Sequence, residues 1–284
     1  MQKNKSSETA EGVAAIRAME SSRPAGDRRI NDPYARVFLG NKWLKWVKYP
    51  LLTWLFYNLG NIKFPGFRGS LIARVCFMNQ CIKECFPKEF TQLVILGAGY
   101  DMSGYIFRDA LKDAKVFEVD HPDTQNYKRA RIEEHFNDGP DNIVYIPVDF
   151  ETDDLKASLL NHGYSRFEKT LFLWEGVCYF LKREIVEQTF DFVVDNSGAG
   201  SRLAFDFFPP EVVDGTSSEK LGKEMYKLVN KLGEPYKFGM GKDEMLRLLR
   251  EHQYTNIQYY TTMDIKKTFF AEDRINREVS PVFN

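Results

Sequence analysis

Thr91–Gly104 reads TQLVILGAGYDMSG and decides the fold of this chain. Its apolar run from Leu93 to Leu96 stops at a Gly-Ala-Gly turn, which is typical of a buried parallel strand that feeds a tight loop. Gly97 and Gly99 have no Cβ, so the backbone can turn sharply there and a ligand can approach it closely. The stretch therefore predicts a binding loop at the end of a central strand.

A second strand, in VFEVDHP, ends in Asp120. Asp120 follows Gly97 at close to the spacing of about 20 residues at which a carboxylate hydrogen-bonds a nucleotide ribose. A dinucleotide fingerprint needs a third glycine where this chain has Met102, and the carboxylate of Asp101 in the turn would repel a pyrophosphate. S-adenosylmethionine has no phosphate and carries an ammonium group. These residues therefore favour S-adenosylmethionine over NAD, with a nucleotide-free α/β domain as the remaining alternative.

Composition restricts the classes of function. The chain has 284 residues, of which 43% are hydrophobic, and its 39 basic and 40 acidic side chains give a net charge of -1. This balance predicts no bulk attraction to nucleic acid or to an acidic membrane. The first residues contain no apolar signal segment, which predicts a cytoplasmic protein. The apolar window Tyr49–Leu59 is shorter than the about 20 residues that span a bilayer, so we expect no stable membrane insertion.

From Thr91 onward, strand and helix patterns alternate, which predicts a mostly parallel sheet with helices on both faces. The strands are expected at 91–97, 114–119, 142–148, 169–174 and 201–207, with a last strand at about 256–262. The intervening helices are expected at 102–112, 122–136, 152–161 and 182–195. Residues 1–88 are expected to form a helical N-terminal cover or lid. Residues 89–284 are expected to form a Rossmann-like core with a lid-like insertion at about 209–238.

The ends of the predicted strands carry acidic residues. Ligands of open parallel sheets bind outside the carboxyl ends of the strands. Four of the five strand ends from Thr91 to Phe207 have a carboxylate: Asp120, Asp149, Glu175 and Asp206. Each carboxylate taken alone could be a helix N-cap. Together they suit a ligand that has ribose hydroxyls, an exocyclic amine and an ammonium group.

Several pieces of the chain resemble the leucine carboxyl methyltransferase-like family of S-adenosylmethionine-dependent O-methyltransferases, which includes polyketide-type O-methyltransferases. The matching pieces lie between Thr9 and about Asp195 and read TAEGVAAIRAMES, NDPYA, IARVCFMNQCI, VILGAGYDMSGYIF, VFEVDHPDTQNYKRARI, VDF and WEGVCYFL. The EVDHP and EGV-x-Y-x-L pieces, in this order and spacing, are specific to that family. The resemblance implies a Rossmann-like methyltransferase fold and S-adenosyl-L-methionine as the cofactor.

The resemblance also implies roles for single residues. It implies that the cofactor is bound by Arg17, Arg74, Gly97, Gly99, Asp120, Asp149, Phe150 and Glu175. The two arginines are expected at the methionine carboxylate, with the two glycines beneath it. Asp120 is expected at the ribose, the pair Asp149–Phe150 beside the adenine, and Glu175 near the methionine end.

The chemistry expected of such a site is simple. Methyl transfer from a sulfonium mainly requires an aligned nucleophile and the exclusion of water. The sequence identifies no certain catalytic base. His121 and Tyr179 are the candidates, and a turn histidine bonded to the backbone is the competing interpretation of His121. No residues have metal-ligand spacing and the four cysteines form no C-x-x-C pair, so we expect metal-independent chemistry.

The sequence thus predicts an O-methyltransferase that acts on a hydroxyl or carboxylate of a small, aromatic or polyketide-like metabolite. The aromatic stretch from Trp43 to Phe67 could provide an apolar lid over such an acceptor, or it could simply cover the core. Two alternatives stay open: a carboxyl methyltransferase acting on a protein C-terminus, and a non-catalytic protein that binds a cofactor or a partner. A nucleic-acid partner is not expected. The identity of the acceptor and the oligomeric state are left open.

Overall fold

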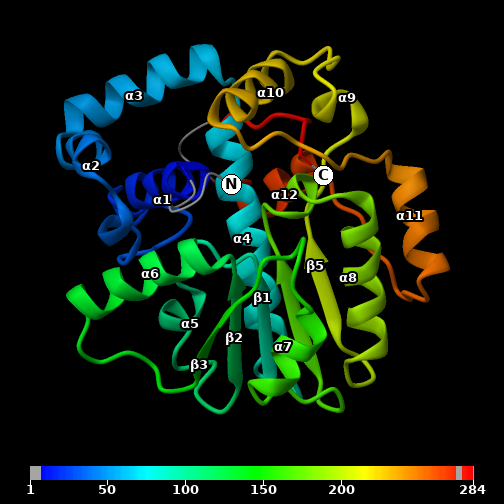
Figure 1. Ribbon diagram of the computed structural model, residues 1–284. Helices are drawn as coiled ribbons and strands as arrows, with labels where there is room; N and C mark the ends of the chain where they lie inside the picture. The colour runs from blue at the N-terminus through cyan, green and yellow to red at the C-terminus, as the bar shows by residue number, and fades with distance from the viewer. Residues whose placement is uncertain (1–7, 273–276, 284) are drawn as a thin grey trace.

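A five-stranded parallel sheet forms the centre of the molecule (Figure 1). The computed structural model describes residues 8–272 and 277–283, without the side chains of Lys42, Pro50, Leu51, Trp54 and 56–58. The strands are β1 (Gln92–Leu96), β2 (Lys115–Asp120), β3 (Ile143–Pro147), β4 (Thr170–Trp174) and β5 (Arg202–Phe205). They are ordered β3-β2-β1-β4-β5, and every neighbouring pair is parallel. The strand order reverses between β1 and β4, which is where open α/β sheets bind their ligands.

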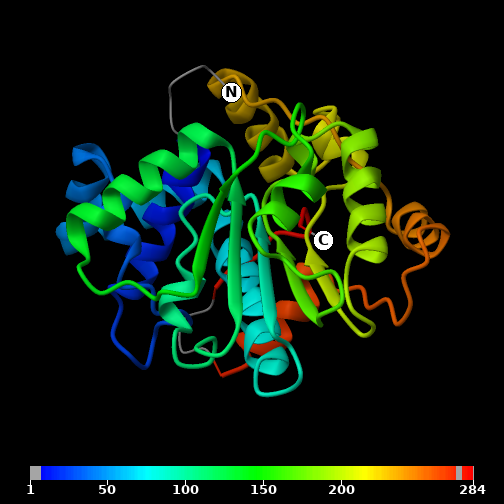
Figure 2. The same ribbon diagram turned by 60° about the horizontal axis from the view of Figure 1, so that its bottom comes forward.

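Helices cover both faces of the sheet and its carboxyl edge. They are α1 (Glu8–Ser21), the 3-10 helix η1 (Ala35–Phe38), α2 (Asn41–Lys48), α3 (Pro50–Lys63), α4 (Phe67–Cys85), α5 (Ser103–Ile106), α6 (Pro122–His135), α7 (Leu155–Asn161), the 3-10 helix η2 (Cys178–Phe180), α8 (Arg183–Asp195), α9 (Pro210–Val213), α10 (Lys220–Leu232), α11 (Lys242–Glu251) and α12 (Thr262–Phe269). Figures 1 and 2 show α4 on one side of the sheet and α7 and α8 on the other. Helices α1, α3 and α10 lie at the end of the sheet where the strands finish.

The alternation of side chains along β1 explains this layering, because successive residues of a strand point to opposite faces. Leu93 and Ile95 pack in the cluster that contains side chains of α4. Val94 and Leu96 pack in the larger cluster that contains side chains of α7 and α8. All four side chains are buried. A strand that is apolar on both faces is therefore sandwiched between two helical layers, as the sequence pattern predicted.

The aromatic stretch before the first strand forms α2, α3 and the beginning of α4. Trp43 and Trp46 pack against the cluster formed by α1 and Tyr100. Phe64 packs against the main core. The side chains of Trp54 and Tyr57, on which a mobile lid would also depend, lie outside the described part of the structure. The described aromatic residues cover α1 and the core, and a lid movement stays a prediction.

Two expected elements are wrong. The last strand, expected at about 256–262, is irregular chain that pairs with no strand of the described sheet. Asn256 has a φ of 53°, which interrupts the extended conformation, although Ile257 and Tyr259 still pack against the core. The helix expected at 102–112 is reduced to α5, and the side chain of Asn142 donates to the carbonyls that follow it. In both places local contacts replace the element that the apolar spacing suggested.

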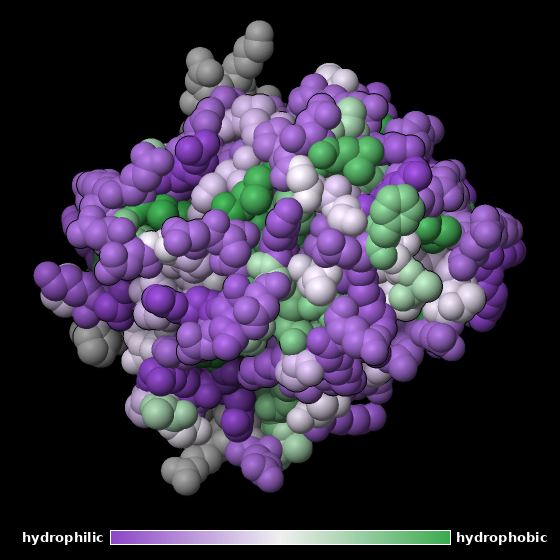
Figure 3. All heavy atoms as spheres, turned by 90° about the horizontal axis from the view of Figure 1, so that it is seen from below, coloured by the Kyte–Doolittle hydropathy of each residue, from purple (hydrophilic) through white to green (hydrophobic). Residues whose placement is uncertain are grey.

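The surface at the other end of the sheet is largely hydrophilic over the residues that the structure describes (Figure 3). Figure 3 views this end, where the strands begin, and hydrophilic side chains dominate it with apolar residues in small separate groups. Scattered exposed apolar residues are normal for a protein surface. Among the described helices, none has the length and apolar character needed to cross a membrane.

Candidate functional site

The glycine turn after β1 is built into the carboxyl edge of the sheet. The amides of Gly97 and Ala98 donate to the carbonyl of Val119 in β2, at 2.8 and 2.9 Å. Both turn glycines have positive φ, 70° at Gly97 and 48° at Gly99. A Cβ on Gly97 would lie 2.3 Å from Cγ2 of Val177, so a larger residue fits neither the conformation nor the space. The turn thus needs glycine at position 97 for two separate reasons.

Asp120 ends β2 and faces this turn. Its carboxylate accepts a hydrogen bond from the amide of Gly99 and one of 2.6 Å from the amide of His121. Burial raises the pKa of Asp120, and the two amide hydrogen bonds oppose that rise. The side of Gly99 where a Cβ would lie is open among residues 8–272 and 277–283, of which only the Cβ of Ala10, at 3.7 Å, comes within 4 Å of that position. A ligand can therefore approach the turn beside the Asp120 carboxylate.

His121 begins α6 as its N-cap. Its side chain accepts a hydrogen bond of 3.3 Å from the amide of Asp123 through Nδ1. Its Nε2 lies 3.8 Å from Oδ2 of Asp149. These contacts support the interpretation of His121 as a turn histidine bonded to the backbone.

Asp149 and Phe150 follow β3, beyond Asp120 along the same edge. The carboxylate of Asp149 accepts a hydrogen bond of 2.9 Å from the amide of Glu151, and its side chain is 37% exposed. Phe150 packs against the main core. The pair therefore lies at the more open end of the edge, joined to Asp120 through the intervening His121.

Arg17 reaches the glycine turn from α1. Its side chain is 8% exposed and donates to the carbonyl of Tyr100, which lies 83 positions further along the chain. Its Nε lies 3.3 Å from Oδ2 of Asp32, and its Nη1 lies 3.9 Å from Oδ2 of Asp101. The other oxygen of Asp32 accepts the amides that open η1. Helix α1 is thus held against the turn after β1 by a buried guanidinium.

Arg74 of α4 joins three groups at the other end of the site. Its Nε lies 2.9 Å from Oε1 of Glu175, and its Nη1 lies 2.8 Å from Oδ2 of Asp206. Nη1 also donates to the hydroxyl of Tyr179 at 3.2 Å. The turn after β4, the end of β5 and α4 therefore meet at one guanidinium.

Tyr179 forms part of an aromatic wall beside this cluster. Its ring stacks on Phe208 with ring centres 4.2 Å apart, and Tyr236 packs edge-on against it at 5.3 Å. Burial raises the pKa of Tyr179 well above its ordinary value, so its hydroxyl is neutral at physiological pH. Tyr179 thus provides a wall and a hydrogen-bond partner for Arg74, and its high pKa does not suit a general base.

Sequence reasoning missed a buried ion pair beneath the glycine turn. Lys128 of α6 donates to the carbonyl of Asp101 and lies 2.5 Å from the carboxylate of Glu118. Both charged side chains are 1% exposed. Glu118 in the apolar strand VFEVD was the available signal, because a charged residue on a buried strand requires a partner. The sequence of α6 does not distinguish Lys128 from the basic residues around it.

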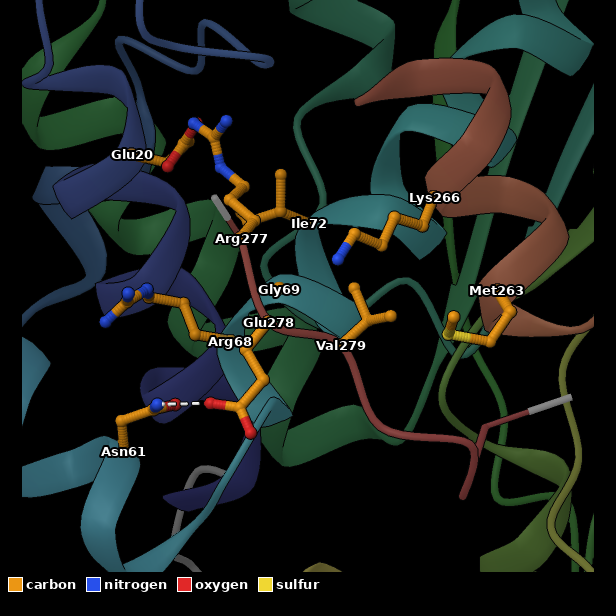
Figure 4. Close-up of a pocket in the computed structure, with 10 residues that line it drawn as sticks. All are labelled: Glu20, Asn61, Arg68, Gly69, Ile72, Met263, Lys266, Arg277, Glu278 and Val279. Carbon is orange, nitrogen blue, oxygen red and sulfur yellow. Dashed lines mark hydrogen bonds and ion pairs between the residues drawn. The ribbon is translucent and has the colours of Figure 1, made fainter. Parts of the chain in front are cut away.

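A separate cavity of about 400 Å³ lies beside α4, at the face that carries Gly69 and Ile72 (Figure 4). It is lined by Glu20, Asn61, Arg68, Gly69, Ile72, Met263, Lys266, Arg277, Glu278 and Val279. The C-terminal segment closes one wall, through the buried pair of Arg277 with Glu20 and a hydrogen bond of 2.6 Å from Asn61 to Glu278. No residue of the strand ends contributes to this cavity, so we do not assign it to the cofactor.

Comparison with known sequences identifies a protein family for this chain. Residues 10–194 match the family model described as leucine carboxyl methyltransferase. A protein of Rhodococcus jostii is 31% identical over 75% of this chain and 68% of its own length. YktD of Bacillus subtilis is 28% identical over 72% of this chain and 67% of its own length. Both proteins are named as candidate S-adenosyl-L-methionine-dependent methyltransferases.

Comparison with solved structures agrees on the fold. A candidate methyltransferase from Thermobifida fusca has a TM-score of 0.58 and 15% identity, over 99% of this chain and 90% of the other. A DUF574 family protein from Streptomyces avermitilis has a TM-score of 0.56 and 14% identity, over 87% and 83%. This chain therefore belongs to the leucine carboxyl methyltransferase family, with the fold of an S-adenosylmethionine-dependent methyltransferase and S-adenosyl-L-methionine as its cofactor.

Proposed function

We propose that this protein transfers a methyl group from S-adenosylmethionine to a hydroxyl or carboxylate oxygen of a small, aromatic or polyketide-like metabolite. The observation that carries this proposal is the aromatic wall of Tyr179, Phe208 and Tyr236 beside Arg74 at the carboxyl edge of the sheet. Aromatic rings stack favourably on flat acceptors, and Tyr236 is the half-buried ring of the three at which an acceptor would contact the wall. The wall therefore suits a flat, aromatic acceptor.

The residues at this edge fit the charges of the cofactor. S-adenosylmethionine carries an ammonium, a sulfonium and one carboxylate, so it is a net cation. Four acidic side chains, Asp32, Asp101, Glu175 and Asp206, lie within 4 Å of two buried arginines at this edge, and the carboxylate of Asp120 accepts the amide of Gly99 in the turn after β1. An acidic excess of this kind is complementary to a cationic ligand.

We propose that the cofactor lies along the edge from the arginines to the end of β3. Arg17 and Arg74 would hold its carboxylate, and Glu175 would face its ammonium group. The glycine turn would lie beneath its methionine part, with Asp120 at the ribose. The pair Asp149–Phe150 would flank the adenine at the more open end.

The chemistry requires little from acidic or basic side chains. When bound, the cofactor supplies an electrophilic methyl group on sulfur. The protein's residues then orient the acceptor oxygen and exclude water, for which the buried aromatic wall is suited. A carboxylate acceptor is already ionised at neutral pH, whereas a phenol has a pKa of about 10 and must lose its proton. The site as described is therefore complete for a carboxylate acceptor.

Turnover of labelled S-adenosylmethionine tests this proposal. The panel contains phenols, aromatic carboxylic acids, aliphatic alcohols, amines and a peptide with a free C-terminal leucine. We expect an O-methyl ether or methyl ester of an aromatic acceptor. Turnover of the peptide alone would establish the protein-directed alternative. An N-methyl product would overturn the proposal, as would cofactor binding without transfer to any acceptor in the panel.

Replacement of Asp120 tests the cofactor site itself. Asp120→Ala removes a carboxylate whose hydrogen bonds to the ribose are each worth about 1.5–3 kcal/mol, so affinity for S-adenosylhomocysteine should fall at least about tenfold. Isothermal titration calorimetry measures this change. Asp154→Ala is the matched control, because Asp154 also accepts a backbone amide, at 2.9 Å, but caps α7 away from the site. Equal affinities of Asp120→Ala and the control would reject the assigned site.

A further inference from the structure

Asp206 contacts three residues of the strand-end region, Arg74, Gly176 and Cys178. It directly follows β5 and lies beyond residues 10–194, the part of the chain that matches the family model. Its side chain is 7% exposed. One carboxylate oxygen lies 2.8 Å from Nη1 of Arg74, and the other accepts a hydrogen bond of 2.6 Å from the amide of Gly176. Its carbonyl accepts a hydrogen bond of 2.9 Å from Sγ of Cys178.

These contacts attach two separate parts of the site to the end of β5. Arg74 comes from α4, 132 positions before Asp206, and Gly176 comes from the turn that carries Glu175. A Cβ on Gly176 would lie 3.3 Å from Nη2 of Arg74, so the turn and the guanidinium are already in close contact. Gly176 also has a φ of 76°, a conformation that other residues rarely adopt. The carboxylate of Asp206 therefore holds both the arginine and the backbone beside Glu175.

We propose that Asp206 is a positioning residue of the cofactor site, which fixes the Arg74 guanidinium and the turn after β4 so that Glu175 faces the cofactor's ammonium group. This inference rests on the proposed placement of the cofactor at the carboxyl edge of the sheet. Asp206 acts through Arg74 and Gly176, and it is not required to touch the cofactor. An interaction of this kind depends on both the charge of Asp206 and the length of its side chain.

The charges that face Glu175 give this role a measurable signature. Burial raises the pKa of Glu175, Arg74 lowers it, Asp206 and Asp101 raise it, and Arg17 lowers it. Glu175 must be ionised to bind an ammonium group, so affinity should fall as the pH drops through its pKa. Loss of the negative charge at position 206 lowers the pKa of Glu175 and moves this loss of affinity to lower pH.

Three variants of the full-length protein separate charge, position and folding. Asp206→Asn should lower the affinity for S-adenosylhomocysteine at neutral pH at least tenfold, because its amide cannot both accept from Gly176 and attract Arg74. It should also move the acid limb of the affinity profile, measured by calorimetry from pH 5 to 8, to lower pH. Asp206→Glu keeps the charge at a different position, so its affinity should fall while the acid limb stays as in the wild type. Asp191→Asn is the control, since Oδ1 of Asp191 lies 2.5 Å from Nδ1 of His252 on the surface, away from the site.

The outcomes distinguish this inference from the function on which it rests. If the wild-type protein does not bind S-adenosylhomocysteine, the proposed function is wrong and the role of Asp206 is wrong with it. If the wild type binds, Asp120→Ala binds weakly and both Asp206 variants bind like the wild type, only the role of Asp206 is wrong. A lower melting temperature of the Asp206 variants with an unchanged affinity profile would also overturn the positioning role of Asp206. If Asp206→Asn does not fold, Asp206→Glu decides, and wild-type affinity in that variant would reject a positioning role.

Discussion

Replacement of Lys128 by methionine should destabilise the protein and loosen the glycine turn. The Nζ of Lys128 lies 2.5 Å from the carboxylate of Glu118 and also donates to the carbonyl of Asp101. Methionine keeps much of the length and apolar volume of the lysine side chain, so the packing of α6 against the sheet is disturbed little. The substitution mainly removes the only charge that the structure pairs with Glu118 among the described residues.

The expected magnitude follows from the burial of the pair. Both side chains are 1% exposed, so neither charge is solvated once its partner is removed. Breaking a buried ion pair by removing one partner destabilises a protein by about 3–5 kcal/mol. For a chain of this size each kcal/mol lowers the melting temperature by about 2 °C, which predicts a decrease of about 6–10 °C for Lys128→Met.

The loss of stability in Lys128→Met should depend on pH, in a direction that follows from the pKa of Glu118. Burial already raises the pKa of Glu118 above its ordinary value, while Lys128 lowers it. Without Lys128 the folded-state pKa rises further, so the folded protein holds a proton on Glu118 over a wider range than the unfolded chain does. Stability then decreases as the pH rises from the unfolded-state pKa of about 4.3 through the raised folded-state pKa. The deficit of Lys128→Met should therefore be smaller at pH 5 than at pH 8.

Urea denaturation of four proteins provides the assay: the wild type, Lys128→Met, Glu118→Gln and the double variant. Replacement of a whole buried pair by neutral groups is often nearly neutral, so the double variant should be more stable than the sum of the two single losses predicts. Its affinity for S-adenosylhomocysteine should stay below that of the wild type, because the carbonyl of Asp101 has still lost its donor. Additive losses, or a Lys128→Met deficit that is constant between pH 5 and pH 8, would refute the reasoning.

Two further substitutions test the turn and the C-terminal segment. Gly97→Ala should destabilise the protein by more than Gly233→Ala in chemical denaturation. The two glycines have φ values of 70° and 77°, and an alanine in this conformation costs about 1–2 kcal/mol at either position. Of the two, only at Gly97 would the new Cβ also collide with a neighbour, Val177. Equal losses would show that Val177 moves aside. Arg277→Ala should lower the melting temperature, because it removes a partner of the buried carboxylate of Glu20. The loss of unfolding free energy should stay below the about 3–5 kcal/mol of a fully broken buried pair, since Nε of Arg23 still lies 3.1 Å from that carboxylate. The exposed Arg250→Ala is its control in thermal unfolding, and a similar melting temperature for both variants would contradict a stabilising role for Arg277.

Local patterns predicted the parts of the fold that depend on local physics. The run from Leu93 to Leu96 is apolar on both faces because β1 is covered by helices on both sides. Gly97 was identifiable because its positive φ and its contact with Val177 leave no room for a side chain. The strand expected at about 256–262 failed for the converse reason. The apolar spacing of Ile257 and Tyr259 reports burial, and burial alone does not require a partner strand.

The partners of charged residues could not be predicted in the same way. Asp206 was visible as a strand-end carboxylate, but its contact with Arg74 joins residues 132 positions apart. Lys128 resembles the surface lysines of an ordinary helix until the fold places Glu118 beneath it. The resemblance to a known family named Arg17 and Arg74, and the structure places both at the strand ends. Sequence patterns thus indicate which residues are charged at the edge, whereas the fold determines which of them share a partner.

The two arginines explain why the helices before β1 and the binding edge should form as one unit. Arg17 comes from α1 and Arg74 from α4, yet their buried guanidiniums lie against the turns after β1 and β4. Unfolding of either helix would leave the largely buried carboxylate of Asp101 or Glu175 without its arginine, which is unfavourable. A ligand that binds only the assembled edge must therefore stabilise these helices along with the sheet, by an amount set by its concentration and affinity. Amide protons of α1 and α4 should accordingly exchange more slowly when S-adenosylhomocysteine is bound, and protection confined to the strands would mean that the helices are independent of the site.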